Sequence, residues 1–120
     1  MVILDSNIFI YLANSGLNRQ VIAKQDIAHA SITRIEALGF SRIPVNELLL
    51  LTSFLNESYN LPLTDSVVER ATKLRQAKKM GLGDSIIAAT ALEHGLTLWT
   101  ANTDDFARID GLNVFNPLTN

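Results

Sequence analysis

Acidic side chains recur at similar positions in this sequence, each where a predicted strand has just ended or where a predicted helix begins. They are Asp5, Glu36, Asp84 and the pair Asp104 and Asp105. Two carboxylates about 4 Å apart repel each other by about 4 kcal/mol at an effective dielectric constant of about 20, so acids that gather at one place need raised pKa values or a cation. Oxygen ligands without His or Cys select hard ions such as Mg²⁺ or Mn²⁺. Such an ion binds phosphate oxygens and can activate a water for in-line attack, so the pattern favours metal-assisted chemistry on a phosphate ester.

Each of these acids also has an ordinary structural explanation. Asp5 can cap the helix predicted from residue 7 to 13, because Asp is a good N-cap residue. Thr33 and Glu36 have the Thr-x-x-Glu spacing of a capping box, in which the glutamate needs no catalytic role. These explanations weaken because the acids recur at comparable places, and because ligands of open α/β sheets bind at the carboxyl ends of the strands.

The elements that must position these acids are short apolar strands that alternate with helices. Strands are predicted at residues 2–4, 26–32, 59–63, 96–100 and 113–115, and helices at 7–13, 19–25, 31–40, 44–57, 65–80 and 84–94. Residues 101–106 are expected to form a polar turn directly after the fourth strand. Strands that alternate with helices predict a doubly wound parallel α/β sheet of four or five strands with helices on both faces.

Composition predicts one globular domain that covers residues 1–120, since 48% of the residues are apolar and 18% are charged. The absence of cysteine excludes disulfides and thiolate zinc sites, and it fits a reducing cytoplasm. No run approaches the roughly 18 apolar residues of a membrane span. The N-terminus lacks the features of a secretory signal, so we expect a cytoplasmic protein.

The helix predicted from 44 to 57 is apolar around more of its girth than one core-facing stripe requires. Leucine occupies four consecutive positions, 48–51, and Phe54 and Leu55 follow. Part of this surface is expected to contact a partner protein or a second copy of the chain. The alternative is a helix that the rest of the domain covers completely. The histidines, His29 and His94, are expected to be structural, His94 because it precedes a glycine at a helix end.

Half of all the lysines and arginines lie within ten residues of a chain whose net charge is −2. They are Arg70, Lys73, Arg75, Lys78 and Lys79. A local basic patch can steer a polyanion even when the whole protein is mildly acidic. An ordinary solvated helix face is an equally good explanation of the cluster.

Several other chemistries fit the sequence poorly. It has no phosphate-binding loop of the Walker type, and residues 81–83 are too short for a dinucleotide fingerprint. The Gly-x-Ser-x-Gly pattern of a hydrolase nucleophile is absent. Residues 5–7 lack the second Asp of a phosphoaspartyl phosphatase. No lysine follows the strand predicted at 96–100, as a phosphoacceptor signalling domain would require.

Taken in order along the chain, these motifs resemble those of PIN domain ribonucleases. The resemblance rests on residues 4–7 (Leu-Asp-Ser-Asn), on Glu36 after Thr33, on Asp84 at the start of an alanine-rich helix, and on residues 99–106, 106–112 and 116–117. It covers about residues 2–118. The nearest group is the short, single-domain VapC-type toxins of toxin–antitoxin systems.

The resemblance implies a doubly wound parallel sheet and an endoribonuclease that depends on Mg²⁺ or Mn²⁺. It also implies a homodimer and a cognate antitoxin that blocks the acidic pocket. By position, Asp5, Glu36 and Asp84 correspond to the metal-binding acids of the family. Asn7 corresponds to the polar residue that orients the first acid, and Thr33 lies one helical turn before Glu36.

The fourth acid departs from the family pattern, because Thr103 stands where many relatives have an aspartate. Asp105 is the preferred replacement and Asp104 the alternative, and the departure puts a second metal ion in question. Thr100 and Asn102 could support the site through hydrogen bonds. The competing hypothesis is a catalytically inactive PIN-like module that binds RNA or a protein, motivated by Thr103 and by the leucine-rich helix.

Overall fold

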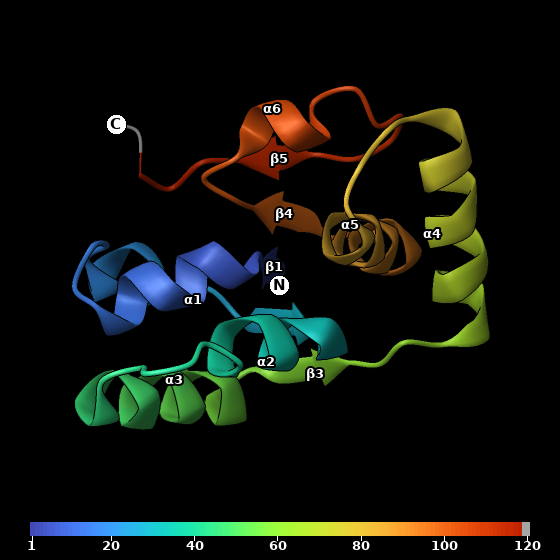
Figure 1. Ribbon diagram of the computed structural model, residues 1–120. Coiled ribbons are helices and arrows are strands. Elements are labelled where there is room, and N and C mark those ends of the chain that lie inside the picture. Colours follow the sequence, from blue (N-terminus) through green and yellow to red (C-terminus); the bar gives the residue numbers. More distant parts are fainter. Residues whose placement is uncertain (119–120) are drawn as a thin grey trace.

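Five short strands form one parallel sheet in the order β3-β2-β1-β4-β5 (Figure 1). The computed structural model describes residues 1–118, so residues 119 and 120 of the predicted domain lie outside the described residues. The strands are β1 (Val2–Leu4), β2 (Ile27–Ala30), β3 (Tyr59–Leu61), β4 (Thr97–Trp99) and β5 (Val114–Phe115). The apolar β1 lies at the centre, where Ile3 pairs with Ala28 on one side and Leu98 on the other. The predicted doubly wound sheet is confirmed.

Helices cover both faces of this sheet, as predicted. They are α1 (Ser6–Ala13), α2 (Ser31–Leu38), α3 (Val45–Glu57), α4 (Asp65–Ala77), α5 (Leu82–His94) and α6 (Thr103–Phe106), with a 3₁₀ turn η1 (Arg19–Val21). Figure 1 shows α1 and α3 on one side of the strands, and α5 on the other side with α4 outside it. Helix α2 contacts α1, α3 and α5, so it joins the two sides.

Several predicted boundaries are wrong: α5 already begins at Leu82, α4 ends at Ala77, and β3 and β4 are shorter than predicted. Three other differences change an element more. The second strand ends at Ala30, because Ser31 already begins α2. The helix predicted at 19–25 is only the turn η1, which Asn18 caps by accepting a hydrogen bond from the Gln20 N–H. The polar turn predicted at 101–106 contains the short helix α6, with acidic residues in its first turn, where the helix dipole favours them.

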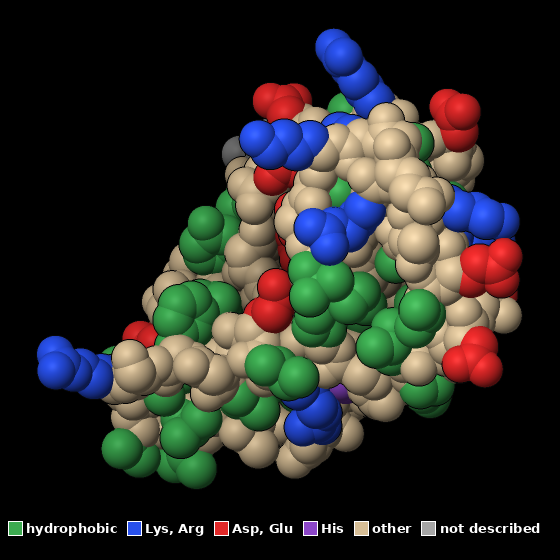
Figure 2. Space-filling model, turned by 45° about the vertical axis from the view of Figure 1, so that its right-hand side comes forward, with side chains coloured by type: hydrophobic (Ala, Val, Ile, Leu, Met, Phe, Trp, Pro, Cys, Tyr) green, Lys and Arg blue, Asp and Glu red, His purple; other side chains and the backbone are tan. Residues whose placement is uncertain are grey.

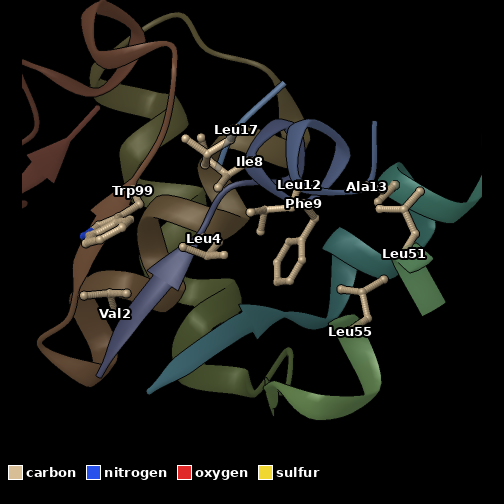
Figure 3. Packing of buried hydrophobic residues seen from close by; sticks show 11 residues of the cluster. Val2, Leu4, Ile8, Phe9, Leu12, Ala13, Leu17, Leu51, Leu55 and Trp99 are labelled. Carbon is tan, nitrogen blue, oxygen red and sulfur yellow. The ribbon is translucent and has the colours of Figure 1, made fainter. Parts of the chain in front are cut away.

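Alternate residues of β1 face opposite sides of the sheet, because strand side chains alternate. Val2 and Leu4 point toward α1 and α3, where they pack in a cluster that includes Phe9 and Leu55 (Figure 3). Ile3 points the other way and packs with residues of α5. The short strand is therefore buried on both faces, which explains why it is a continuous apolar run.

Helix α5 has apolar side chains on two opposite faces because it lies between the sheet and α4. Ile87 and Ala88 pack with the residues of the sheet, and Ile86 and Ala89 pack with α4. The helix ends at Gly95, whose φ of 64° is in the left-handed region that glycine adopts without strain. The prediction that His94 belongs to the end of this helix is confirmed.

Helix α3 leaves part of its apolar surface exposed. Leu51 and Leu55 are buried in the core, whereas Val45 and Leu49 are exposed. The alternative of a completely covered helix is therefore wrong.

Within residues 1–118, no helix is long and apolar enough to cross a membrane.

His29 is a structural residue of β2, as expected, with no exposed surface. Its Nδ1 lies 2.6 Å from the hydroxyl of Ser58, and its ring meets the ring of Phe9 edge-on. Burial lowers the pKa of His29 to about 4, and the nearby charge of Arg34 contributes. The ring is therefore neutral at pH 7.

Candidate active site

Polar residues from four separate elements meet at the carboxyl edge of the sheet. Asp5 directly follows β1, Glu36 lies on α2 after β2, and Asp105 lies on α6 after β4. Asp84 lies in the first turn of α5. Because α5 leads back into β4, it runs opposite to the strands and starts at the edge where they end. Topology thus explains how acids far apart in the sequence come together.

Asp5 is buried and is held by two hydrogen bonds. The Ser6 N–H donates to Oδ1 at 2.7 Å, and the Thr100 hydroxyl donates to Oδ2 at 2.7 Å. Burial raises the pKa of Asp5 in spite of these hydrogen bonds, and the charges of Glu36 and Asp105 raise it further. The carboxylate is therefore well oriented, but its negative charge is poorly compensated.

Glu36 is oriented by Ser6 and not by a capping box. The Ser6 hydroxyl donates to Oε1 of Glu36 at 2.7 Å and lies 3.3 Å from the Thr33 hydroxyl oxygen. The N-cap of α2 is Ala30, and no side chain caps this helix. The capping-box interpretation of Thr33 and Glu36 is therefore wrong, because the helix begins earlier than that interpretation requires.

Asp84 shows that the acids act on one another. Burial raises the pKa of Asp84 to about 6, and the charges of Asp5, Asp105 and Glu36 add to the effect. Asp105 also raises the pKa of Asp5, whereas Asp104 contributes to neither shift. This difference supports Asp105 over Asp104 as the fourth acid.

The supporting residues differ from their predicted roles. Thr100 contacts Asp5 and also accepts a hydrogen bond from the backbone N–H of Asn102 at 3.0 Å, so Asn102 acts through its backbone. Within residues 1–118, Asn7 makes no hydrogen bond to Asp5, and its buried Oδ1 has no partner. Ser6, which sequence reasoning did not select, contacts both Asp5 and Glu36. Its only signal in the sequence is a hydroxyl directly after the acid.

The donor set fits a hard divalent cation by charge and chemistry. The acids offer only oxygen ligands, which Mg²⁺ and Mn²⁺ prefer. Burial first, and then the neighbouring carboxylates, raise the pKa values of Asp5 and Asp84, and a bound cation would oppose both effects. The unpartnered Oδ1 of Asn7 is a further oxygen. Within the described residues, however, no group of three or more Asp, Glu or His side chains is already close enough to hold an ion. The fit therefore does not rest on a preformed cage.

The predicted basic cluster divides into two parts. Arg75, Lys78 and Lys79 line a cleft of about 630 Å³ together with Asp84, Asp104 and Asp105. Lys78 also donates a hydrogen bond to the backbone oxygen of Asp105 at 2.8 Å. Figure 2 shows acidic side chains inside a hollow of the surface and basic side chains above it.

The other two basic residues are engaged elsewhere. Arg70 forms an ion pair with Glu93 at 3.0 Å, and Lys73 forms one with Glu69 at 3.3 Å. They line a separate groove that contains none of the site acids. A surface for a polyanion beside the acids therefore consists of three residues rather than five.

This fold has counterparts in known proteins. A family model described as PIN domain matches residues 2–112, so the chain belongs to the PIN domain family. Ribonuclease VapC1 of Rickettsia felis is 35% identical over 83 residues, which are 68% of this chain and 57% of that protein. The match therefore spans less than two thirds of that relative.

Solved structures agree along nearly the whole chain. A toxin–antitoxin complex from Klebsiella pneumoniae has a TM-score of 0.78 at 30% identity, with 98% of both chains covered. VapBC2 from Rickettsia felis, bound to a DNA fragment from its promoter, has a TM-score of 0.80 at 26% identity, with 97% of this chain and 98% of that chain covered. The resemblance that the sequence motifs indicated is confirmed.

Proposed function

We propose that this chain is a divalent-metal-dependent endoribonuclease that hydrolyses RNA phosphodiester bonds, and that it is the toxin of a toxin–antitoxin pair. The observation that carries the proposal is the set of four mutually repelling acids at the carboxyl edge of a PIN domain sheet: Asp5, Glu36, Asp84 and Asp105. Such a set is unfavourable without a cation. The name of the relative Ribonuclease VapC1 supports RNA as the substrate.

Asp5, Glu36 and Asp84 would hold Mg²⁺ or Mn²⁺, and Asp105 would complete the site. When bound, the cation would neutralise the carboxylates and supply Lewis acidity toward a phosphate oxygen. The hydroxyls of Ser6 and Thr100 hold Glu36 and Asp5 in fixed orientations. Asp84 keeps its proton below about pH 6 in the free protein, so the site binds a cation best above that pH.

The basic side chains beside the acids would contact the RNA backbone. Arg75, Lys78 and Lys79 line the same cleft as Asp84, so a phosphate bound to them lies near the reacting position. Contacts of this kind are electrostatic and do not read base sequence. RNA binding is therefore expected to weaken steeply as the salt concentration rises.

The partners follow from the same family. Toxin–antitoxin complexes are among the matched structures, and we propose a cognate antitoxin that covers the acidic cleft. The exposed apolar side chains of α3, Val45 and Leu49, support a protein contact, which we propose to be a homodimer. We further propose that residues 1–120 act as one cytoplasmic domain.

The deciding experiment compares Mn²⁺ binding and RNA cleavage in wild type, Asp5→Asn and Asp84→Asn, with Asp104→Asn as a matched control. Both site variants should stay folded and lose more than about a hundredfold in metal affinity, the upper limit for losing a group that only orients a ligand. Calorimetric titration and cleavage of a labelled RNA measure the two effects. If Asp5→Asn cleaves RNA at the wild-type rate, the assignment of the site is wrong.

One observation favours the second candidate, an inactive PIN-like module that binds RNA or a protein. Within the described residues, the acids do not form a group ready to hold an ion, and Thr103 stands where relatives often have an aspartate. The same titration separates the two proposals. A folded wild-type protein that binds no Mn²⁺ at millimolar concentration would support the inactive module.

A further inference from the structure

Gly83 lies against the carboxylate of Glu36 in a way that leaves no room for a side chain. A Cβ atom at position 83 would overlap Oε2 of Glu36 and lie 3.0 Å from its Cδ. Gly83 belongs to the first turn of α5, and its φ is not in the positive range that requires glycine. Glycine is unfavourable in a helix compared with alanine. The backbone conformation therefore does not explain why position 83 is glycine. The explanation is the space that the missing side chain leaves for the Glu36 carboxylate.

The opposite side of the Glu36 carboxylate is held by Ser6. The Ser6 hydroxyl donates to Oε1 at 2.7 Å, and Ser6 itself is buried. One oxygen of Glu36 is thus fixed by a hydrogen bond, while the other lies over the bare Cα of Gly83. The carboxylate therefore occupies a narrow position between Ser6 and Gly83, the residue that precedes Asp84.

A methyl group at position 83 would displace Glu36 rather than unfold the protein. The atoms that it meets are the far end of a flexible side chain, not backbone. Glu36 can turn to another rotamer, but it would then lose the hydrogen bond from Ser6. The expected result is a stable protein with a misplaced carboxylate.

We propose that Gly83 is a positioning residue: by lacking a side chain, it allows the Glu36 carboxylate to lie against the start of α5, while Ser6 fixes the other oxygen. The consequence for metal binding rests on the proposed function, whereas the position of Glu36 does not. Gly83 thereby sets the position of Glu36 on α2 relative to the start of α5, which carries Asp84.

The test compares Gly83→Ala with Gly81→Ala. Gly81 is a matched control because a Cβ there meets nothing within 4 Å. Calorimetric titration should show Mn²⁺ binding at least about tenfold weaker in Gly83→Ala, the effect typical of disturbing a ligand's orientation, and nearly unchanged in Gly81→Ala. The midpoint of thermal unfolding of metal-free Gly83→Ala should equal or exceed that of wild type.

A second variant pair separates positioning from a general disturbance of the helix. Aspartate at position 36 is one methylene shorter than glutamate and does not reach Gly83. Adding Gly83→Ala to Glu36→Asp should therefore leave the remaining Mn²⁺ affinity unchanged. A further loss in the double variant would show that Gly83 acts on something other than Glu36, and the proposal would fail.

The ¹³C resonance of the Glu36 carboxyl group, recorded without metal, distinguishes this proposal from the proposed function. Gly83→Ala should shift the resonance and Gly81→Ala should not. Wild-type Mn²⁺ affinity in Gly83→Ala, or an unmoved resonance, would overturn the inference while the nuclease proposal stands. If the wild type binds no Mn²⁺, the proposed function fails, and the resonance alone decides whether Gly83 positions Glu36.

Discussion

The two halves of the acidic site are held in place in different ways. On the side of β1 and α2, the carboxylates of Asp5 and Glu36 accept hydrogen bonds from Thr100 and Ser6. On the side of α5 and α6, the carboxylates of Asp84 and Asp105 receive no hydrogen bond from any described residue. One half is fixed before anything binds, and the other half is free to adjust.

This difference explains two features of the site. Because Asp84 and Asp105 are not held by hydrogen bonds, their carboxylates are not fixed in a ready ligand group, and none is found among residues 1–118. Burial and the neighbouring carboxylates raise the pKa of Asp84 to about 6, and no hydrogen bond offsets this rise. A bound cation would neutralise the negative charge of the carboxylates, and the side chains of Asp84 and Asp105 would move toward it.

The largest difference between the two halves is expected when one hydrogen bond on the fixed side is removed, because metal binding and cleavage should then fall. Thr100→Val deletes the donor to Oδ2 of Asp5 with little change in volume, so Asp5 loses its orientation. Mn²⁺ affinity and RNA cleavage should fall by about 10- to 100-fold. Thr100→Ser keeps the hydroxyl and should retain most of both. Equal losses in the two variants would mean that Thr100 acts by packing and not by its hydroxyl.

On the adjustable side, by contrast, we expect a substitution to stabilise the protein, because the negative charge of Asp84 destabilises the metal-free fold. The folded-state pKa of Asp84 is raised from 3.8 to about 6, so its contribution to stability is fully present below pH 3.8 and is lost as the pH rises through 6. Asp84→Asn should therefore stabilise the metal-free protein above pH 6. We expect a gain on the order of 1 kcal/mol, because solvent screening reduces the full value of the shift at this partly exposed residue.

Urea unfolding in EDTA at pH 5 and pH 7.5 measures this effect as a difference between variant and wild type. The difference is needed because His29 has the opposite sign: its pKa is lowered from 6.5 to about 4, so its contribution to stability is lost as the pH falls. His29 is present in both proteins and cancels. If Asp84→Asn is less stable than wild type at pH 7.5, the charge of Asp84 is already compensated in the free protein.

The fold was largely predictable because its signals are local. The apolar run of residues 2–4 and the glycine at 95 mark a strand and a helix end by themselves. The positions of Asp5 and Asp84 follow from these boundaries. The start of α2 at residue 31 was predicted as well, but an equally local signal, the capping-box spacing of Thr33 and Glu36, was misleading, because the N-cap is Ala30, three residues before Thr33.

The details of the site were not predictable because its contacts cross the fold. Ser6 and Glu36 are 30 positions apart in the sequence, and Asp5 and Thr100 are 95 apart. The basic cluster looked uniform in the sequence, yet Arg70 forms an ion pair with Glu93 of the neighbouring helix α5. Only the packing of α4 on α5 determines which cations remain beside the acids.

The smallest expected effect tests whether the cations beside the adjustable half bind the substrate. Each part of the basic cluster offers one arginine and one lysine for exchange, so Arg75→Gln/Lys79→Gln and Arg70→Gln/Lys73→Gln are matched double variants. In the non-cleaving Asp5→Asn background, the first pair should weaken RNA binding several-fold. It should also lower the slope of log K against log salt concentration by about 1.4, at about 0.7 for each phosphate contact to a single strand.

Fluorescence anisotropy across a salt series measures both quantities. The second pair should leave them nearly unchanged, because its cations are paired outside the cleft. Equal losses in the two pairs would show that RNA binds along the whole of α4 and that the division of the cluster has no role in binding.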